Sequence, residues 1–170
     1  NPFNPLPESA DSALTQKGTS LMTDLLYYQD AYQIEFTATV TAAEAGDGNP
    51  RVALDRTAFY PGGGGQPHDL GWLTVDGNRY AVTSVKKEGT TIWHTLSGNS
   101  ALAIGAPIQG EIDWARRHLL MRTHTAMHIL CAVVWRDYGA SVTGGNMEPL
   151  RGRMDFEFES MKQEFVREIE

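Results

Sequence analysis

Short runs of alternating apolar and polar residues fill the stretch from about residue 34 to residue 112. In the first run every second position is apolar, which places these side chains on one side of a strand: Ile34, Phe36, Ala38 and Val40. Such β-rich runs recur between turn signals, at residues 33–41, 79–85 and 90–95. With a hairpin turn at residues 76–78, this spacing predicts a small antiparallel β-barrel or sandwich over residues 22–112.

The pattern changes to that of a helix after Asp113, a suitable N-cap, and continues without Gly or Pro to Gly139. We therefore predict a helix over residues 114–138 and a domain boundary at its start. A turn at Gly144-Gly145, a strand over 151–158 and a helix over 161–170 complete the prediction. The expected fold class is α+β, with residues 113–170 as the second, α+β domain.

Residues 1–21 mix Pro, Ser, Thr, Ala and Gly with little apolar periodicity, and they lack the features of a secretory signal. We expect a disordered leader before a natural start at Met22, and two origins stay open: a genuine extension or residues added for expression. The single cysteine, Cys131, excludes an internal disulfide framework. No apolar run is long enough to cross a membrane, so we expect a soluble, cytoplasmic protein of unknown oligomeric state.

The formal net charge of -7 disfavours a protein that coats nucleic acid, but it permits a local basic patch. Arg116, Arg117, His118 and Arg122 form such a group near the start of the predicted helix. They are candidates for contacts with RNA phosphates. The alternative, that these arginines pair with neighbouring carboxylates, is equally consistent with the sequence.

Four consecutive glycines, residues 62–65, lie between Thr57 and the polar residues Gln66 and Asp69. Glycines let a backbone approach a ligand closely, so Thr57, Gln66 and the backbone of Gly63, Gly64 and Gly65 are candidate substrate-binding groups. The segment is not a phosphate loop, because the Gly-Lys-Ser/Thr ending is missing. A long glycine turn between two strands is the simpler interpretation, and the sequence leaves both open.

His124 and His128 are four residues apart on the predicted helix, so their imidazoles share one face and suit a single zinc ion. The zinc-protease motif places Glu directly after its first His, whereas this chain has Thr125 there. Cys131 is about 10.5 Å of helix rise from His124, too far to share that ion, and is expected to be a small buried apolar residue. Two histidines on a polar helix face, without a metal, remain the alternative.

Two motifs together resemble a known family: Gly63-Gly-Gly-Gln66-Pro-x-Asp69-x-Gly71, and Arg116-Arg-x-x-x-x-Arg122-x-His124-Thr-Ala-x-His128. From about Met22 onward the chain is similar to the editing domain of alanyl-tRNA synthetase and its freestanding relatives, the AlaX proteins, in their longer form. The resemblance implies a β-barrel followed by an α+β editing core. It also implies hydrolysis of the ester that joins misattached serine, and in many members glycine, to tRNA(Ala).

In that family zinc is bound by the two helical histidines and by a Cys and a His from a downstream Cys-x-x-x-His segment. Only His124 and His128 have counterparts here, so the editing core is expected to be C-terminally incomplete and this chain to lack full activity. Gln66, Asp69 and Thr125 are the candidate catalytic residues, and Arg116, Arg117 and Arg122 the candidate tRNA contacts. Asp155 is a weaker carboxylate candidate, better explained as an exposed strand charge.

Thr57, Gln66 and Thr125 could hydrogen-bond the hydroxyl that distinguishes serine from alanine. Two other functions remain open at this point: a tRNA-binding module without hydrolytic activity, and another zinc-dependent hydrolase.

Overall fold

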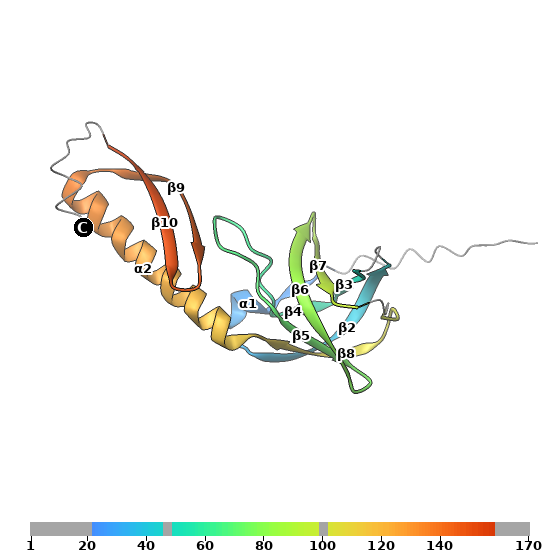
Figure 1. Cartoon of the computed structure of the whole chain (residues 1–170). Helices are drawn as coiled ribbons and strands as arrows, with labels where there is room; N and C mark the ends of the chain where they lie inside the picture. Colours follow the sequence, from blue (N-terminus) through green and yellow to red (C-terminus); the bar gives the residue numbers. More distant parts are fainter. Residues whose placement is uncertain (1–21, 46–48, 99–101, 159–170) are drawn as a thin grey trace, which may run out of the picture.

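The computed structural model describes residues 22–45, 49–98 and 102–158. Within them the chain forms a closed β-barrel and an arm that projects from it (Figure 1). The predicted leader and the predicted helix over 161–170 lie outside the described residues.

Six antiparallel strands close the barrel in the order β2-β3-β7-β6-β5-β8. Their bounds are β2 Glu35–Glu44, β3 Arg51–Leu54, β5 Gly71–Val75, β6 Asn78–Glu88, β7 Thr91–Leu96 and β8 Pro107–Ile112. This confirms the α+β class with an antiparallel barrel. Three of the strands coincide with the runs predicted from alternation, and the tight turn at Asp76 and Gly77 joins β5 to β6.

Inward-facing aliphatic and aromatic side chains fill the barrel. In β2 Phe36, Ala38 and Val40 are buried as the alternation predicts, whereas Ile34 precedes the strand and is 38% exposed. Phe59, Leu54, Leu73 and other members of this cluster are fully buried. The barrel therefore has a complete hydrophobic core of its own.

A short segment beside the barrel leads into β2. β1 Asp24–Leu25 pairs in parallel with β4 Arg56–Thr57, and α1 Leu26–Gln29 follows β1 directly. Figure 1 shows α1 where the barrel meets the long helix.

The arm consists of α2 Trp114–Tyr138 and the antiparallel hairpin β9 Ser141–Glu148 and β10 Arg151–Glu157. Asp113 caps α2 by accepting a hydrogen bond from the Arg116 N–H, and Gly139 is the C-cap, so both helix signals in the sequence are confirmed. The predicted turn at Gly144-Gly145 is wrong, because both residues lie inside β9. A side chain at Gly145 would meet the backbone of β10, its Cβ 2.8 Å from the Arg153 carbonyl oxygen.

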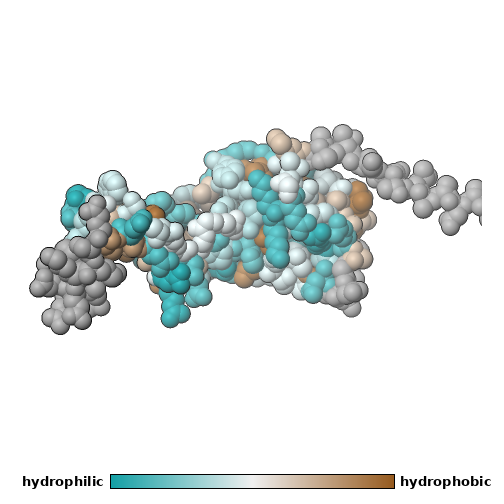
Figure 2. All heavy atoms as spheres, turned by 90° about the horizontal axis from the view of Figure 1, so that it is seen from above, coloured by the Kyte–Doolittle hydropathy of each residue, from teal (hydrophilic) through white to brown (hydrophobic). Residues whose placement is uncertain are grey.

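The arm is much less buried than the barrel. Four residues of α2 are buried: Arg117, Leu120, Thr123 and Val134. Large apolar side chains lie exposed on α2 and the hairpin: Ile129, Leu130, Val133, Trp135, Val142 and Leu150. In the space-filling view, apolar side chains appear among polar ones on the narrow part of the molecule that the arm forms (Figure 2).

No helix among the described residues is both long enough and apolar enough to span a lipid bilayer.

Candidate functional site

The two predicted metal-binding histidines face each other on the exposed side of α2. Their rings stack with centroids 4.8 Å apart and planes 17° from parallel, and the Nε2 atoms of His124 and His128 lie 3.0 Å apart. The helical spacing therefore brings two imidazole nitrogens within hydrogen-bond distance, close enough for both to bind one metal ion once neither Nε2 carries a proton.

Gln66, from the glycine segment, reaches this pair. Its Oε1 lies 2.8 Å from Nδ1 of His124. An amide oxygen can only accept, so Nδ1 carries the ring proton and Nε2 keeps its lone pair. A hydrogen bond that fixes the tautomer and leaves the other nitrogen free is typical of a metal-binding histidine. Gln66 is thus placed to orient His124.

The glycine segment is docked against the arm through its backbone. Gly63 and Gln66 exchange N–H···O bonds of 2.9 and 3.0 Å, and the Met147 N–H of β9 donates to the Gly65 carbonyl at 3.0 Å. Gly65 has φ +83°, and a Cβ there would lie 2.3 Å from the Gly145 carbonyl oxygen. Only glycine fits where the two backbones come this close, and their contact places Gln66 next to His124.

A pocket of about 450 Å³ opens beside the histidine pair. His124, His128 and Met127 of α2 form one wall, Gly64 another, and β9 and β10 complete it with Val142 and Met154 among others. Its lining is mostly apolar around a few polar groups, as is common for small-molecule sites.

Cys131 also lines this pocket and is partly buried, with its Sγ 4.0 Å from the sulfur of Met154. Within the part of the chain that the structure describes, no three His, Cys, Asp or Glu side chains come together to hold a metal ion. The described residues therefore supply two imidazole ligands.

Asp69 and Arg117 form a buried ion pair, with only 1% and 4% of their surfaces exposed. Arg117 Nε donates to Asp69 Oδ1 at 2.8 Å, and its Nη2 donates to Oδ2. The Tyr60 N–H also donates to Asp69, and the guanidinium donates to the carbonyls of Ala31 and Ala58. Neither side chain reaches solvent, so the structure gives no support to a role of Asp69 in catalysis or of Arg117 in tRNA contact, and both stay predictions. The pair instead joins α2 to the glycine segment and to the residues after α1.

Thr57 is fully buried and does not line the pocket beside the histidines, so its substrate-binding role stays a prediction. Its hydroxyl lies 2.8 Å from Nε2 of His94, whose Nδ1 donates to the Val52 carbonyl. Burial lowers the pKa of His94 to about 4, so the imidazole is neutral and accepts the threonine proton. The Phe59 N–H donates to the same hydroxyl, which places Thr57 in a structural network.

The other candidate residues are dispersed. Thr125 is exposed, and its hydroxyl donates to the Met121 carbonyl of the preceding turn. Arg116 donates to the His68 carbonyl at 2.6 Å, whereas Arg122 is exposed beside the hollow between α2 and β10. Asp155 is exposed and pairs with Arg153, in agreement with a strand charge. The tRNA contacts of Arg116 and Arg122 stay predictions.

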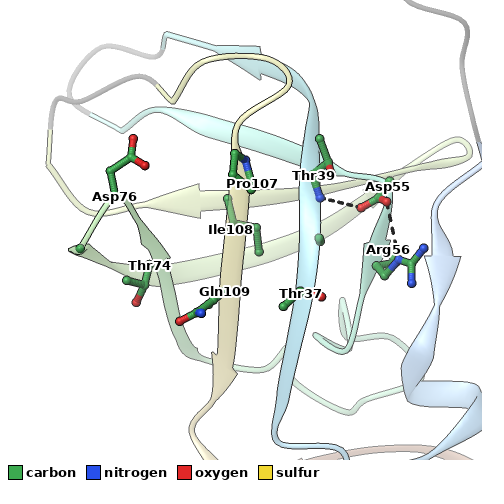
Figure 3. A pocket seen from close by; sticks show the side chains of 11 residues that line it. Thr37, Thr39, Asp55, Arg56, Thr74, Asp76, Pro107, Ile108 and Gln109 are labelled. Atoms are coloured by element: carbon green, nitrogen blue, oxygen red, sulfur yellow. Dashed lines mark hydrogen bonds and ion pairs between the residues drawn. The ribbon is translucent and has the colours of Figure 1, made fainter.

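A second hollow, of about 650 Å³, lies on the outer face of the barrel (Figure 3). One of its two carboxylates, Asp55, accepts from the Thr39 N–H at 2.7 Å and pairs with Arg56 at 3.6 Å, and the other is Asp76. Among the described residues no imidazole or thiol lines this hollow, so it offers no chemistry comparable to that of the histidine pair.

Comparison with known proteins identifies the family of the chain. Residues 8–116 match the family described as tRNA synthetases class II (A). The alanyl-tRNA editing protein AlaX-M of Saccharolobus solfataricus is 44% identical over 141 residues, which are 82% of this chain and 58% of that protein. AlaX-M of Methanosarcina mazei is 39% identical over 156 residues, 88% of this chain and 61% of that protein.

The alanine–tRNA ligase of Thermoplasma acidophilum is 39% identical over 151 residues, 87% of this chain and 17% of the ligase. The chain spans about three fifths of the length of the AlaX-M relatives it matches. With its glycine segment and histidine helix in one site, the chain belongs to the family of alanyl-tRNA synthetase and the alanyl-tRNA editing proteins.

Proposed function

We propose that the chain forms part of a trans-editing deacylase, which hydrolyses the ester between misattached serine, or glycine, and tRNA(Ala). The observation that carries the proposal is the contact of Gln66 with Nδ1 of His124 beside the glycine-lined pocket. Relatives named as alanyl-tRNA editing proteins at 39–44% identity support the substrate class.

The donor set fits a zinc ion. Two neutral imidazoles on successive helical turns are common zinc ligands, and a glutamine that fixes the tautomer is the expected outer partner. His124 and His128 would hold the ion, and its remaining ligands would come from outside the described residues. When bound, zinc supplies Lewis-acid chemistry that suits ester hydrolysis.

The chain's own groups would bind and orient the substrate. Gln66 keeps the proton of His124 on Nδ1, and Gly64 leaves room for the aminoacyl group because it has no side chain. Met127, Val142 and Met154 give the pocket an apolar wall. The described part of the pocket lining contains no Asp or Glu that could act as a general base.

Deacylation of seryl-, glycyl- and alanyl-tRNA(Ala) by the full-length protein tests this proposal. We expect hydrolysis of seryl-tRNA(Ala) and glycyl-tRNA(Ala) and sparing of the correct product, since an editor must discriminate. Equal hydrolysis of all three would exclude editing. Binding of tRNA without hydrolysis would favour a tRNA-binding module.

Zinc analysis tests the metal separately. We expect His124→Ala and His128→Ala to lose stoichiometric zinc from the full-length protein. His118→Ala is the matched control on the same helix and should retain it. Full zinc content in both site variants would contradict the proposed ligands.

A further inference from the structure

A chain of aromatic rings leads from the glycine segment to the surface. The Tyr60 hydroxyl lies beside Gly63, 3.7 Å from where a Cβ on that glycine would be. Tyr60 packs edge-on against Tyr27 at 5.5 Å between centroids, and Tyr27 contacts Tyr28 at 4.6 Å. Tyr28 is 75% exposed. The exposed Tyr28 ring is therefore connected, through Tyr27 and Tyr60, to the glycine segment beside the pocket.

A second set of rings lies at the start of α2. Tyr32, 65% exposed, packs against Trp114 at 5.6 Å between centroids. His118 stacks on the same indole at 5.5 Å, with the two planes 15° from parallel. We call Tyr28, Tyr32, Trp114 and His118 the aromatic platform.

The backbone under the platform is fixed. Arg117, held by its buried ion pair, donates to the Ala31 carbonyl at 3.0 Å, and the Tyr32 N–H donates to the Asp30 carboxylate at 2.8 Å. Two exposed tyrosines, four residues apart, are thus tied to the same helix that carries the histidine pair. A surface held in this way loses little conformational entropy when a ligand binds.

The charged side chains around the platform are of both signs. The carboxylates of Asp30 and Asp113 each accept a backbone N–H, and Arg116 lies on the first turn of α2. Burial raises the pKa of Tyr27 to about 12, so the ring beneath Tyr28 stays a neutral phenol. Binding at the platform would therefore come from stacking and not from net charge.

We propose that the aromatic platform stacks the unpaired bases at the 3′ end of an RNA. Exposed aromatic rings bind single strands because every base has a π-face, whatever the sequence. The inference rests on the proposed function, in which the reactive ester is carried by such an unpaired end. The packed rings Tyr28, Tyr27 and Tyr60 would hold the platform in a fixed place relative to Gly63 and the neighbouring pocket residue Gly64.

The test measures binding of an RNA hairpin that carries no amino acid, with and without an unpaired 3′ tail. Binding to the 170-residue chain is measured by fluorescence anisotropy. We expect the tail to tighten binding, and the Tyr28→Ala/Tyr32→Ala variant to weaken binding of the tailed RNA about fivefold or more. Tyr28→Phe/Tyr32→Phe should retain it because the rings remain. Trp135→Ala, which removes an exposed aromatic ring from the far end of α2, is the matched control.

Equal binding of tailed and blunt RNA by the wild type, or unchanged binding by the double alanine variant, would overturn the platform. A loss in the phenylalanine variant equal to that in the alanine variant would also contradict stacking. The urea midpoint of each variant checks the fold. Because the RNA carries no aminoacyl ester, this result is independent of ester hydrolysis. Failed deacylation by the full-length protein would refute the proposed function. A missing effect of the tail in an active deacylase would refute only the platform.

Discussion

The barrel and the arm differ in how they are stabilised. The barrel encloses a continuous core in which residues such as Leu54, Phe59 and Leu73 have no exposed surface. The arm buries four residues of its 25-residue helix and leaves Ile129 and Trp135 61% exposed. The histidine pair therefore lies on the less buried region, and its arrangement depends on the contacts that tie the arm to the barrel.

Two contacts make that connection. The Asp69–Arg117 pair fastens the first turn of α2, and the Gly65 backbone docks on β9. Both come from the segment between β4 and β5, so one loop of the barrel positions the arm and also supplies Gln66. The barrel is thus self-contained, whereas the arrangement of the arm depends on the barrel.

The largest effect is expected from Asp69→Asn. It leaves the Arg117 guanidinium buried without a counter-charge, and removal of one partner of a buried ion pair costs about 3–5 kcal/mol of unfolding free energy. Urea unfolding measures it. Glu111→Gln, which breaks the exposed pair with Arg79, is the matched control and should cost less than about 1 kcal/mol. Similar losses in both variants would contradict the structural role of the buried pair.

Leucine truncation compares the two regions directly. Leu73→Ala creates a cavity in the barrel and should lower the unfolding free energy by about 2–5 kcal/mol. Leu130→Ala, at a position 40% exposed on α2, should cost less than about 1 kcal/mol in this chain. An equal cost at Leu130 would show that the arm is as well packed as the barrel.

Acid should destabilise the barrel through His94. Its folded pKa of about 4 is below the unfolded value of 6.5, so the unfolded state binds the proton first as the pH falls. The contribution of His94 is intact above pH 6.5 and is lost as the pH falls toward 4, by about 3 kcal/mol in all. Urea unfolding across this range measures the slope. His94→Gln should remove the part of the pH dependence of the unfolding free energy that His94 causes. An unchanged pH dependence in this variant would show that another group is responsible.

The smallest effect is expected at Gln66. Gln66→Ala removes the acceptor at Nδ1 of His124 and should weaken zinc binding by the full-length protein about 10–100-fold without altering the barrel. Competition with a chelator measures the affinity. Gln66→Glu keeps an oxygen acceptor and should retain most of it. Wild-type affinity in Gln66→Ala would mean that the contact does not support the metal.

Local signals in the sequence predicted the elements well. Asp113 and Gly139 gave the bounds of α2, because capping depends on neighbouring residues. The alternation in β2 gave its buried face for the same reason. The turn predicted at Gly144 and Gly145 was wrong, because the sequence does not distinguish a glycine that avoids a clash inside a hairpin from a glycine that forms a turn.

Pairings between distant residues could not be predicted. Asp69 and Arg117 are 48 residues apart, and nothing in either neighbourhood indicates that both are buried together. Thr57 and His94 likewise meet only because β4 and β7 are brought together in the fold. The histidine pair was identified because its spacing is local, whereas its contact with Gln66, 58 residues away, required the structure.

The central claim is that the docked glycine segment completes the site on the arm, and two glycine variants of the full-length protein test it most directly. Gly65 and Gly77 have similar positive φ values of +83° and +78°, so alanine strains both, but only at Gly65 does a Cβ meet backbone, while at Gly77 nothing lies within 4 Å. The measurement is the rate of seryl-tRNA(Ala) deacylation. We predict a loss of about a hundredfold in Gly65→Ala, from displacement of Gln66, and a rate near wild type in Gly77→Ala. Equal rates in the two variants would contradict the account.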